Sequence, residues 1–263
     1  MNELKELKDI LMLSLKEAGR ILRKYYGNIS KIEYKSDVNL VTQADKESEA
    51  TIMKIIKSAF PKHKILAEES GITKEESEYK WIVDPLDGTT NYAHTLPIFA
   101  ISIGIECKKE IIMGGVYNPI SNELFFSEKG SGAYLNDKKI HVSKVDKLEK
   151  ALLVTGFPYD RRENVDYYMD VYGKFLKVSQ GVMRLGAAAI DFCSVACGRL
   201  DGYWERKLYP WDQAAGILIV EEAGGKVTDF SGNKTSCYNK QVLVTNGLIH
   251  NEMMKILKKI KHC

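Results

Sequence analysis

The chain contains little cysteine or proline and almost no excess of either charge. Its 263 residues include five cysteines and six prolines, and 38 Lys and Arg against 35 Asp and Glu give a net charge of +3. The cysteines form no Cys-x-x-Cys pair, which argues against a structural zinc site and in favour of free thiols. So small a net charge does not indicate the excess of basic residues that nucleic-acid binding needs, so nucleic acid is not expected as a partner.

Long apolar runs and targeting signals are also missing. No stretch reaches about 18 consecutive apolar residues, the length that a membrane-spanning helix needs. Residues 1–13 mix Glu, Lys and Asp with Leu, so they lack the uninterrupted apolar centre of a signal peptide. We therefore expect a cytoplasmic protein with no membrane partner.

Several signatures of nucleotide-binding and hydrolytic enzymes are absent. Gly130 and Gly132 are followed by Leu135 where a dinucleotide-binding fingerprint has its third glycine, and no Walker A sequence occurs. No local pattern supports an EF-hand loop or a Ser-His-Asp triad. Phosphatases with an aspartyl nucleophile have two aspartates separated by one residue, whereas Asp84 and Asp87 are three positions apart. These enzyme classes are therefore disfavoured.

The spacing of apolar residues divides the chain near residue 150. Before this point it predicts helices at 4–27 and 43–60, followed by strands of a meandering antiparallel sheet. After it, strands and helices alternate as in α/β proteins. The predicted strands are 64–67, 80–84, 99–107, 111–117, 124–127, 132–135, 152–157, 181–185, 202–205, 226–229 and 242–245, and the later helices are 164–176, 187–198, 211–223 and one from 248. We expect an N-terminal α+β part at 1–150 and a C-terminal α/β part at 151–263, which together form one catalytic unit.

The Asp-Pro-Leu-Asp-Gly-Thr-Thr segment at 84–90 carries the most information about chemistry. Because a residue before proline avoids the helical conformation, the preceding strand is expected to end at Asp84. Asp87 can then point to the same side, and the next residues can begin a helix whose free N–H groups favour an anion. The candidate anion-binding residues are Gly88, Thr89 and Thr90. An isolated Asp-Pro-x-Asp-Gly is more often a simple type I turn, so this interpretation depends on the other acids.

Three further acids stand where strands end or helices begin. Glu68 follows the predicted strand 64–67, Asp212 follows Pro210 at a helix start, and Asp45 begins the second helix. Each alone could be an acid that favours a helix N-terminus, an effect of only about 0.3 to 1 kcal/mol. Carboxylates beside an anion site would repel a phosphate unless cations intervene, and Mg²⁺ binds carboxylates, water and phosphate together. The acids therefore predict a magnesium-assisted phosphate site.

These motifs resemble those of the inositol monophosphatase family, the Mg²⁺-dependent, lithium-sensitive sugar and inositol phosphatases. The resemblance extends over nearly the whole chain, with matching segments in the family's order at 41–45, 66–70, 81–92, 186–189, 202–205 and 210–216. It implies a layered αβαβα sugar-phosphatase fold, of mixed α+β and α/β character, and a homodimer.

The resemblance also implies a role for each site residue. The implied ligands of two or three Mg²⁺ ions are Glu68, Asp84, the carbonyl of Leu86, Asp87 and Asp212. The implied catalytic residues are Glu68, Thr89 and Asp87. The implied substrate contacts are Gly88, Thr89, Thr90, Gly186, Ala187, Glu205 and Asp212. Asp45 and Lys35 resemble outer, supporting positions.

The implied activity is hydrolysis of myo-inositol 1-phosphate, a small phosphorylated polyol, through direct attack by a metal-activated water. Fructose 1,6-bisphosphatase, or an enzyme acting on both substrates, is the alternative, because relatives in bacteria and archaea also hydrolyse that bisphosphate. A regulatory protein-binding role in transcription is a minor alternative. Loss of a metal-binding acid would have favoured it, but all four of these acids are present. Arg184 could face a phosphate, although a surface or subunit contact is the simpler interpretation.

Overall fold

The computed structural model describes residues 2–28, 32–36 and 39–259. Their helices are α1 (Asn2–Tyr25), α2 (Gln43–Ala59), α3 (Thr89–Ala93), α4 (Val165–Leu176), α5 (Ala188–Ala196), α6 (Pro210–Glu222) and α7 (His250–Lys258), with 3-10 turns at Leu148–Lys150 and Tyr159–Arg162. The strands of the first half are β1 (Ile32–Ser36), β2 (Asn39–Thr42), β3 (Lys64–Ala67), β4 (Gly71–Ile72), β5 (Tyr79–Asp87), β6 (Ala100–Cys107), β7 (Glu110–Asn118), β8 (Glu123–Glu128), β9 (Ala133–Leu135) and β10 (Lys138–Ile140). Those of the second half are β11 (Leu152–Thr155), β12 (Gly181–Met183), β13 (Gly202–Arg206), β14 (Lys226–Thr228) and β15 (Gln241–Thr245).

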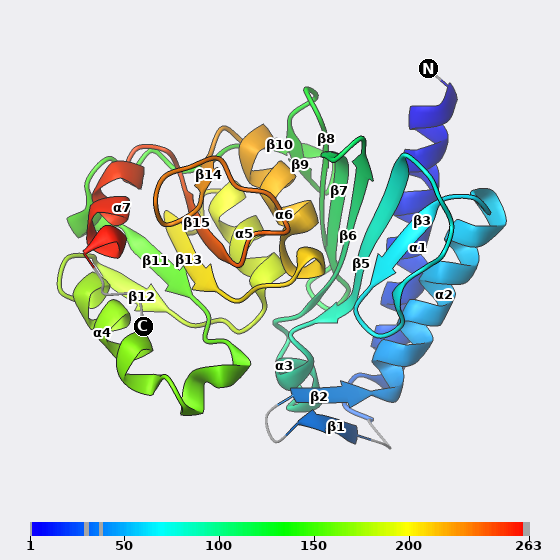
Figure 1. Cartoon of the computed structure of the whole chain (residues 1–263), viewed down its shortest axis with the longest axis horizontal. Coiled ribbons are helices and arrows are strands. Elements are labelled where there is room, and N and C mark those ends of the chain that lie inside the picture. The colour runs from blue at the N-terminus through cyan, green and yellow to red at the C-terminus, as the bar shows by residue number, and fades with distance from the viewer. Residues whose placement is uncertain (1, 29–31, 37–38, 260–263) are drawn as a thin grey trace.

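These elements stack in five layers (Figure 1). From one side to the other, the layers are α1 with α2, an eight-stranded sheet, α5 with α6, a five-stranded sheet, and α4 with α7. The αβαβα fold that the resemblance implies is therefore confirmed. Helix α6 packs on β6 and β7 of the first sheet and α5 packs on β13 of the second, so the middle layer joins the two sheets.

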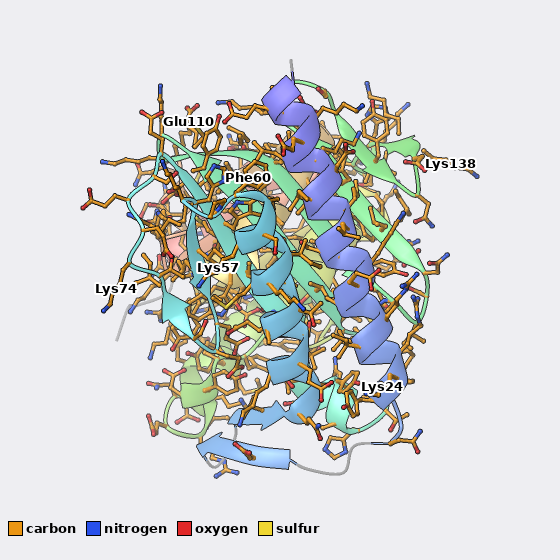
Figure 2. All side chains as sticks on the ribbon, turned by 90° about the vertical axis from the view of Figure 1, so that its right-hand side faces the viewer. Lys24, Lys57, Phe60, Lys74, Glu110 and Lys138 are labelled. Carbon is orange, nitrogen blue, oxygen red and sulfur yellow. The ribbon has the colours of Figure 1, made fainter. Side chains whose placement is uncertain are left out.

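Helices α1 and α2 cover the outer face of the first sheet because each has one apolar side. Leu7, Leu11 and Leu15 recur at four-residue steps on α1 and are fully buried. Figure 2 shows the two helices side by side over the sheet, with the exposed Lys24 and Lys57 on their outer surface. Within the described residues, no helix is both long enough and apolar enough to cross a membrane.

The eight-stranded sheet has the order β10-β9-β8-β7-β6-β5-β3-β4. From β5 to β10, strands adjacent in the sequence pair antiparallel, as the predicted meander requires. At the other edge β3 runs parallel to β5, so the prediction of a wholly antiparallel sheet is wrong there. The short strands β4 and β10 and the polar hairpin β1–β2 were not predicted, because segments so short or so polar have no apolar periodicity.

The five-stranded sheet has the order β12-β11-β13-β15-β14. Strand β11 pairs parallel with both β12 and β13, while β15 pairs antiparallel with β13 and β14. Parallel neighbours need crossover connections, which α4 and α5 provide. The alternation of strands and helices predicted after residue 150 is confirmed, and the sheet that it builds is mixed.

His250, at the start of α7, is buried between two threonines of this sheet. Its Nε2 lies 3.0 Å from Oγ1 of Thr228, and its Nδ1 lies 2.9 Å from Oγ1 of Thr245. Burial lowers the pKa of His250 from 6.5 to about 4, and the positive charge of Lys226 adds to the effect. The imidazole is therefore neutral in the folded chain at neutral pH.

We expect this histidine to make the fold sensitive to acid. Below the pKa of 6.5 expected for the unfolded chain, unfolding takes up a proton at His250, so stability falls as the pH approaches about 4. Between pH 7 and pH 5 this group alone should lower the free energy of unfolding by about 2 kcal/mol. Urea unfolding of the wild type and of His250→Gln at both pH values measures the difference. Equal acid sensitivity of the two proteins would contradict this account.

Candidate active site

Strand β5 carries the first pair of acids to the centre of the molecule. The strand was predicted to end at Asp84, but it continues to Asp87, and its pairing with β6 shifts register between these two residues. Pro85 has no N–H to donate, so it is accommodated in this irregular part of the strand. Asp84 accepts a hydrogen bond of 3.0 Å from the N–H of Leu86. The irregularity thus puts two aspartates and a turn at the end of one strand.

The predicted helix start after Asp87 is confirmed, although the helix is only one turn long. Helix α3 begins directly after Gly88, which has a φ of +87°. A side chain at Gly88 would approach the Cβ of Ala187 and the carbonyl oxygen of Ile98 to 3.0 Å. Glycine is therefore required by both backbone conformation and space.

The carboxyl group of Asp87 is held by the second half of the chain. Its Oδ1 accepts a hydrogen bond of 3.2 Å from the N–H of Ala188, and its Oδ2 accepts one of 2.7 Å from the N–H of Ala189. Both donors are free N–H groups in the first turn of α5, where a negative charge is favoured. Sequence reasoning did not find this role for Ala188 and Ala189, because alanine side chains carry no chemical signal.

Asp45 and Thr89 are joined by a hydrogen bond beside Leu86. Asp45 belongs to the capping box that begins α2, in which its Oδ2 accepts the N–H of Thr42 at 2.8 Å. Its Oδ1 lies 3.2 Å from Oγ1 of Thr89, which is also 3.0 Å from the carbonyl oxygen of Leu86. Burial raises the pKa of Asp45 to about 7. The Thr89 hydroxyl is therefore fixed between two acceptors. The side chain of Lys35, the other predicted supporting residue, lies outside what the structure describes.

Glu68 and Asp212 reach the same place from two other elements. Glu68 directly follows β3, and its N–H donates to the carbonyl of Val83 at 3.2 Å, which ties the loop to β5. Asp212 lies in the first turn of α6, where its Oδ2 accepts the N–H of Tyr209 at 2.6 Å. The predicted helix start after Pro210 is thus confirmed.

A cavity of about 810 Å³ opens beside these groups. Of the predicted site residues, its lining contains Glu68, Asp87, Gly88, Thr89, Thr90, Gly186, Ala187, Glu205 and Asp212. Asp84 and Leu86 do not line it and are buried in β5. Further lining residues that the sequence did not single out for this site include Tyr159, Arg161, Asp191 and Lys207, and Arg184 also belongs to the wall.

Glu205 stands on β13 in the wall contributed by the second sheet. Its Oε2 accepts a hydrogen bond of 2.5 Å from the hydroxyl of Tyr203. A side chain at Gly156 would collide with the Glu205 carboxyl group, so glycine at this position leaves room for it. Burial raises the pKa of Glu205 to about 7.

The acids of the site raise one another's pKa. For Asp84 and Asp212, burial is the main cause of a strongly raised pKa, and the neighbouring acids of the site add to it. For Asp87 the pKa rises to about 7, because burial outweighs the N–H groups of Ala189 and Ala188 that favour the charged form. Buried like charges of this kind require compensating positive charge.

Comparison with known proteins identifies the family. The profile of the inositol monophosphatase family matches residues 3–262. The chain belongs to the inositol monophosphatase family. The resemblance drawn from the motifs is thus confirmed over almost the full length, and with it the prediction of a phosphoric monoester hydrolase at the level of the family.

Individual relatives within the family agree in sequence and in structure. An inositol-1-monophosphatase from Synechocystis is 46% identical over 242 residues, which cover 91% of this chain and 84% of the relative. The crystal structure of the extragenic suppressor protein suhB from Bartonella henselae has a TM-score of 0.92 and 39% identity, covering 96% of this chain and 98% of the other. A fructose-1,6-bisphosphatase/inositol-1-monophosphatase from Aquifex aeolicus is 36% identical, over 98% of both chains.

The donor set of this inositol monophosphatase family member suits Mg²⁺. Hard divalent cations prefer oxygen ligands, and the site offers four carboxyl groups and a backbone carbonyl. Among the described residues, no three His, Cys, Asp or Glu side chains close around one point as a complete ligand cage. Mg²⁺ does not need such a cage, because it commonly uses one or two carboxylates and completes its shell with water and phosphate. The observation that supports a Mg²⁺ site is that these acids are buried and repel one another, so that they need a positive charge between them.

Proposed function

We propose that this chain is a Mg²⁺-dependent phosphomonoesterase that hydrolyses myo-inositol 1-phosphate. The observation that carries the proposal is that Glu68, Asp87 and Asp212, from three separate elements, line one cavity together with Glu205, and that the buried Asp84 is close enough for these three acids to raise its pKa. These four acids can bind cations, and the cations can bind phosphate. The carboxyl group of Glu205 can bind hydroxyl groups of a polyol. The name of the relative from Synechocystis supports the same substrate.

The proposed metal ligands are the carboxyl groups of Glu68, Asp84, Asp87 and Asp212 and the carbonyl of Leu86. We propose two or three ions per site, since each Mg²⁺ needs only one or two of these groups. When bound, Mg²⁺ supplies the positive charge that attracts a phosphate and makes a nearby water more acidic. The protein's contribution is to hold the acids at fixed positions, as the N–H groups of Ala188 and Ala189 do for Asp87.

Thr89 and Glu68 are proposed to orient and deprotonate the attacking water. The Thr89 hydroxyl is already fixed by Asp45 and by the Leu86 carbonyl, so it can accept a proton at Oγ1 while passing its own to Asp45. The backbone N–H groups of Gly88, Thr89 and Thr90 would bind the phosphate oxygens. Water attack then inverts the phosphorus centre without a covalent phosphoenzyme.

The other lining residues are proposed to bind the polyol. Gly186, Ala187 and Glu205 would contact its hydroxyl groups, and Asp212 would reach the oxygen that leaves the phosphorus. Ala187 has no side-chain donor, so its contact has to come from the backbone. Because Glu68 and Asp87 come from the first half of the chain and Glu205 from the second, we propose that 1–150 and 151–263 act as one catalytic unit.

Fructose 1,6-bisphosphate is the second candidate substrate. The relative from Aquifex aeolicus is named for both activities, and Arg161 and Arg184 line the cavity, where a second phosphate could pair with them. We expect a preference for myo-inositol 1-phosphate above about tenfold in kcat/KM, or 1.4 kcal/mol in transition-state binding. Phosphate release from both substrates at saturating Mg²⁺ measures it. A tenfold preference for the bisphosphate would overturn the proposed main substrate.

We also propose that the chain forms a homodimer. Apolar side chains on one face of α4 and on the neighbouring β12 are exposed, namely Val165, Met169, Leu176 and Met183. Exposed apolar groups gathered on one face often mark a protein interface. Light scattering of the purified chain should give twice the mass of 29.7 kDa, and a monomer at all concentrations would refute the proposal.

We also propose that the chain works in the cytoplasm. Among the described residues Cys107, Cys193, Cys197 and Cys237 are free thiols, which suits the reducing cytoplasm.

We propose a regulatory role through protein contacts only as a minor, additional function, because the complete set of acids argues against loss of catalysis. A partner captured equally by the wild type and by Asp87→Asn would establish binding that does not depend on catalysis.

A further inference from the structure

Tyr159 is a side chain of the cavity wall to which the proposed mechanism gives no role. It lies in the 3-10 turn Tyr159–Arg162, it lines the cavity, and it is 48% exposed. Its hydroxyl group makes no hydrogen bond to another residue of the part of the chain that the structure describes. Tyr168, on the neighbouring α4, instead donates to Oδ1 of Asp160 at 2.7 Å. The hydroxyl group of Tyr159 is therefore free to bind a ligand that enters the cavity.

The turn that carries Tyr159 is held in place by the next residue, Asp160. Besides the bond from α4 to its Oδ1, the Oδ2 of Asp160 accepts a hydrogen bond of 2.8 Å from Nδ2 of Asn164 and pairs with the ammonium group of Lys207. Lys207 directly follows β13. The turn is thus joined both to α4 and to the end of β13, so little conformational freedom is lost when its side chains bind a ligand.

The proposed metal-binding acids lie near the hydroxyl group of Tyr159. Three of them, Glu68, Asp87 and Asp212, line the cavity together with it. Partial burial is the main cause of a raised pKa of Tyr159, and the charges of these three acids and of Asp84 raise it further. A tyrosine in these surroundings stays protonated at neutral pH and can donate a hydrogen bond.

A neutral donor suits this place better than a cationic one. An ammonium or guanidinium group beside the acids would pair with the carboxylates and compete with Mg²⁺ for them, whereas a phenol carries no charge. Once cations neutralise the acids, the negatively charged oxygens of a bound phosphate are strong acceptors for such a donor. The proposed phosphate-binding N–H groups of Gly88, Thr89 and Thr90 line the same cavity from the first half of the chain.

We propose that Tyr159 donates a hydrogen bond from its hydroxyl group to a phosphate oxygen of the substrate. The phosphate is then bound by N–H groups from the first half of the chain and by a phenol from the second half. This inference rests on the proposed function, since it adds a residue to the phosphate end of the same cavity.

The test removes only the hydroxyl group. Tyr159→Phe and the wild type are assayed at saturating Mg²⁺ with myo-inositol 1-phosphate and with 4-nitrophenyl phosphate, which share the phosphate and differ in the leaving group. We expect kcat/KM to fall about tenfold on both esters, the low end for a hydrogen bond to a charged group, because water can reach the open site. Isothermal titration with inorganic phosphate at saturating Mg²⁺ should give a Kd raised about tenfold.

Tyr134→Phe is the matched control for this substitution. The hydroxyl group of Tyr134 donates to the carbonyl oxygen of Ser131 at 3.1 Å, and Tyr134 does not line the cavity. This variant should keep the wild-type kcat/KM and the wild-type Kd for phosphate. Thermal unfolding should give the same Tm for Tyr159→Phe and the wild type, because the hydroxyl group that is removed has no partner among the described residues.

Three outcomes would overturn the inference. No loss on either ester would mean that the hydroxyl group does not contact the phosphate, and a loss confined to the inositol ester would mean that it contacts the polyol. A raised Mg²⁺ concentration for half-maximal activity would mean that Tyr159 acts on the ions. Failure of the proposed function looks different, because the wild type would then hydrolyse 4-nitrophenyl phosphate but not the inositol ester.

Discussion

Replacing Asp87 with Asn lowers Mg²⁺-dependent phosphate release by about a thousandfold, or roughly 4 kcal/mol, while the fold persists. The substitution removes a proposed metal ligand, and the asparagine side chain that replaces it has nearly the same shape as aspartate. It also replaces one acceptor oxygen by an NH₂ group, which cannot accept from the N–H of Ala188 or Ala189. Both effects act at the same carboxyl group, so this is the largest single loss that we expect.

The measurement is kcat/KM at saturating Mg²⁺, with circular dichroism and thermal unfolding as checks of the fold. Asp170→Asn is the matched control, because Asp170 is an exposed aspartate of α4 that pairs with Lys174 outside the cavity. It should retain the activity of the wild type. An Asp87→Asn protein that keeps more than a tenth of the wild-type activity would show that Asp87 is not a metal ligand.

Replacing Thr89 with Ala lowers kcat by about a hundredfold or more, the range for loss of a group that assists proton transfer. The hydroxyl of Thr89 lies between Asp45 and the carbonyl of Leu86, so it is held in place before any substrate arrives. Alanine keeps the backbone N–H, which is proposed to bind the phosphate. The loss should therefore appear in kcat, with KM changing much less.

Thr89→Ser is the matched variant for this test because it keeps the hydroxyl and removes only a methyl group. We expect it to retain most of the wild-type kcat. Asp45→Asn should reproduce part of the loss, since Asp45 acts through Thr89. If alanine and serine at position 89 give the same rate, the hydroxyl takes no part in the reaction.

That a helix starts just after Asp87 and that Asp212 lies at a helix start could be predicted from the sequence, because each feature belongs to a local pattern. Asp84 and Asp87 flank a proline in a strand, and Asp212 follows Pro210 at a helix start; in both cases neighbouring residues decide where the carboxyl group points. The helices were predicted well for the same reason, since a stripe such as Leu7, Leu11 and Leu15 is a local property.

What could not be predicted depends on contacts between distant parts of the chain. The N–H groups of Ala188 and Ala189 bind Asp87 across 101 and 102 positions, and an alanine gives no hint of such a partner. Asp191 stands in an apolar helix, where only the folded structure reveals that its oxygens have no hydrogen-bond donor among the described residues. The parallel pairing of β3 with β5 was missed because the apolar pattern of a strand does not specify the direction of its neighbour.

The buried acids of the site are proposed to bind Mg²⁺ for phosphate hydrolysis. Phosphate release from myo-inositol 1-phosphate, measured as free Mg²⁺ is raised from zero in EDTA to saturation, tests it most directly. We predict background release in EDTA, a rise to full activity as the ions bind, and no comparable rise for Asp87→Asn or Asp212→Asn. Full activity of the wild type in excess EDTA would show that these acids do not act through Mg²⁺.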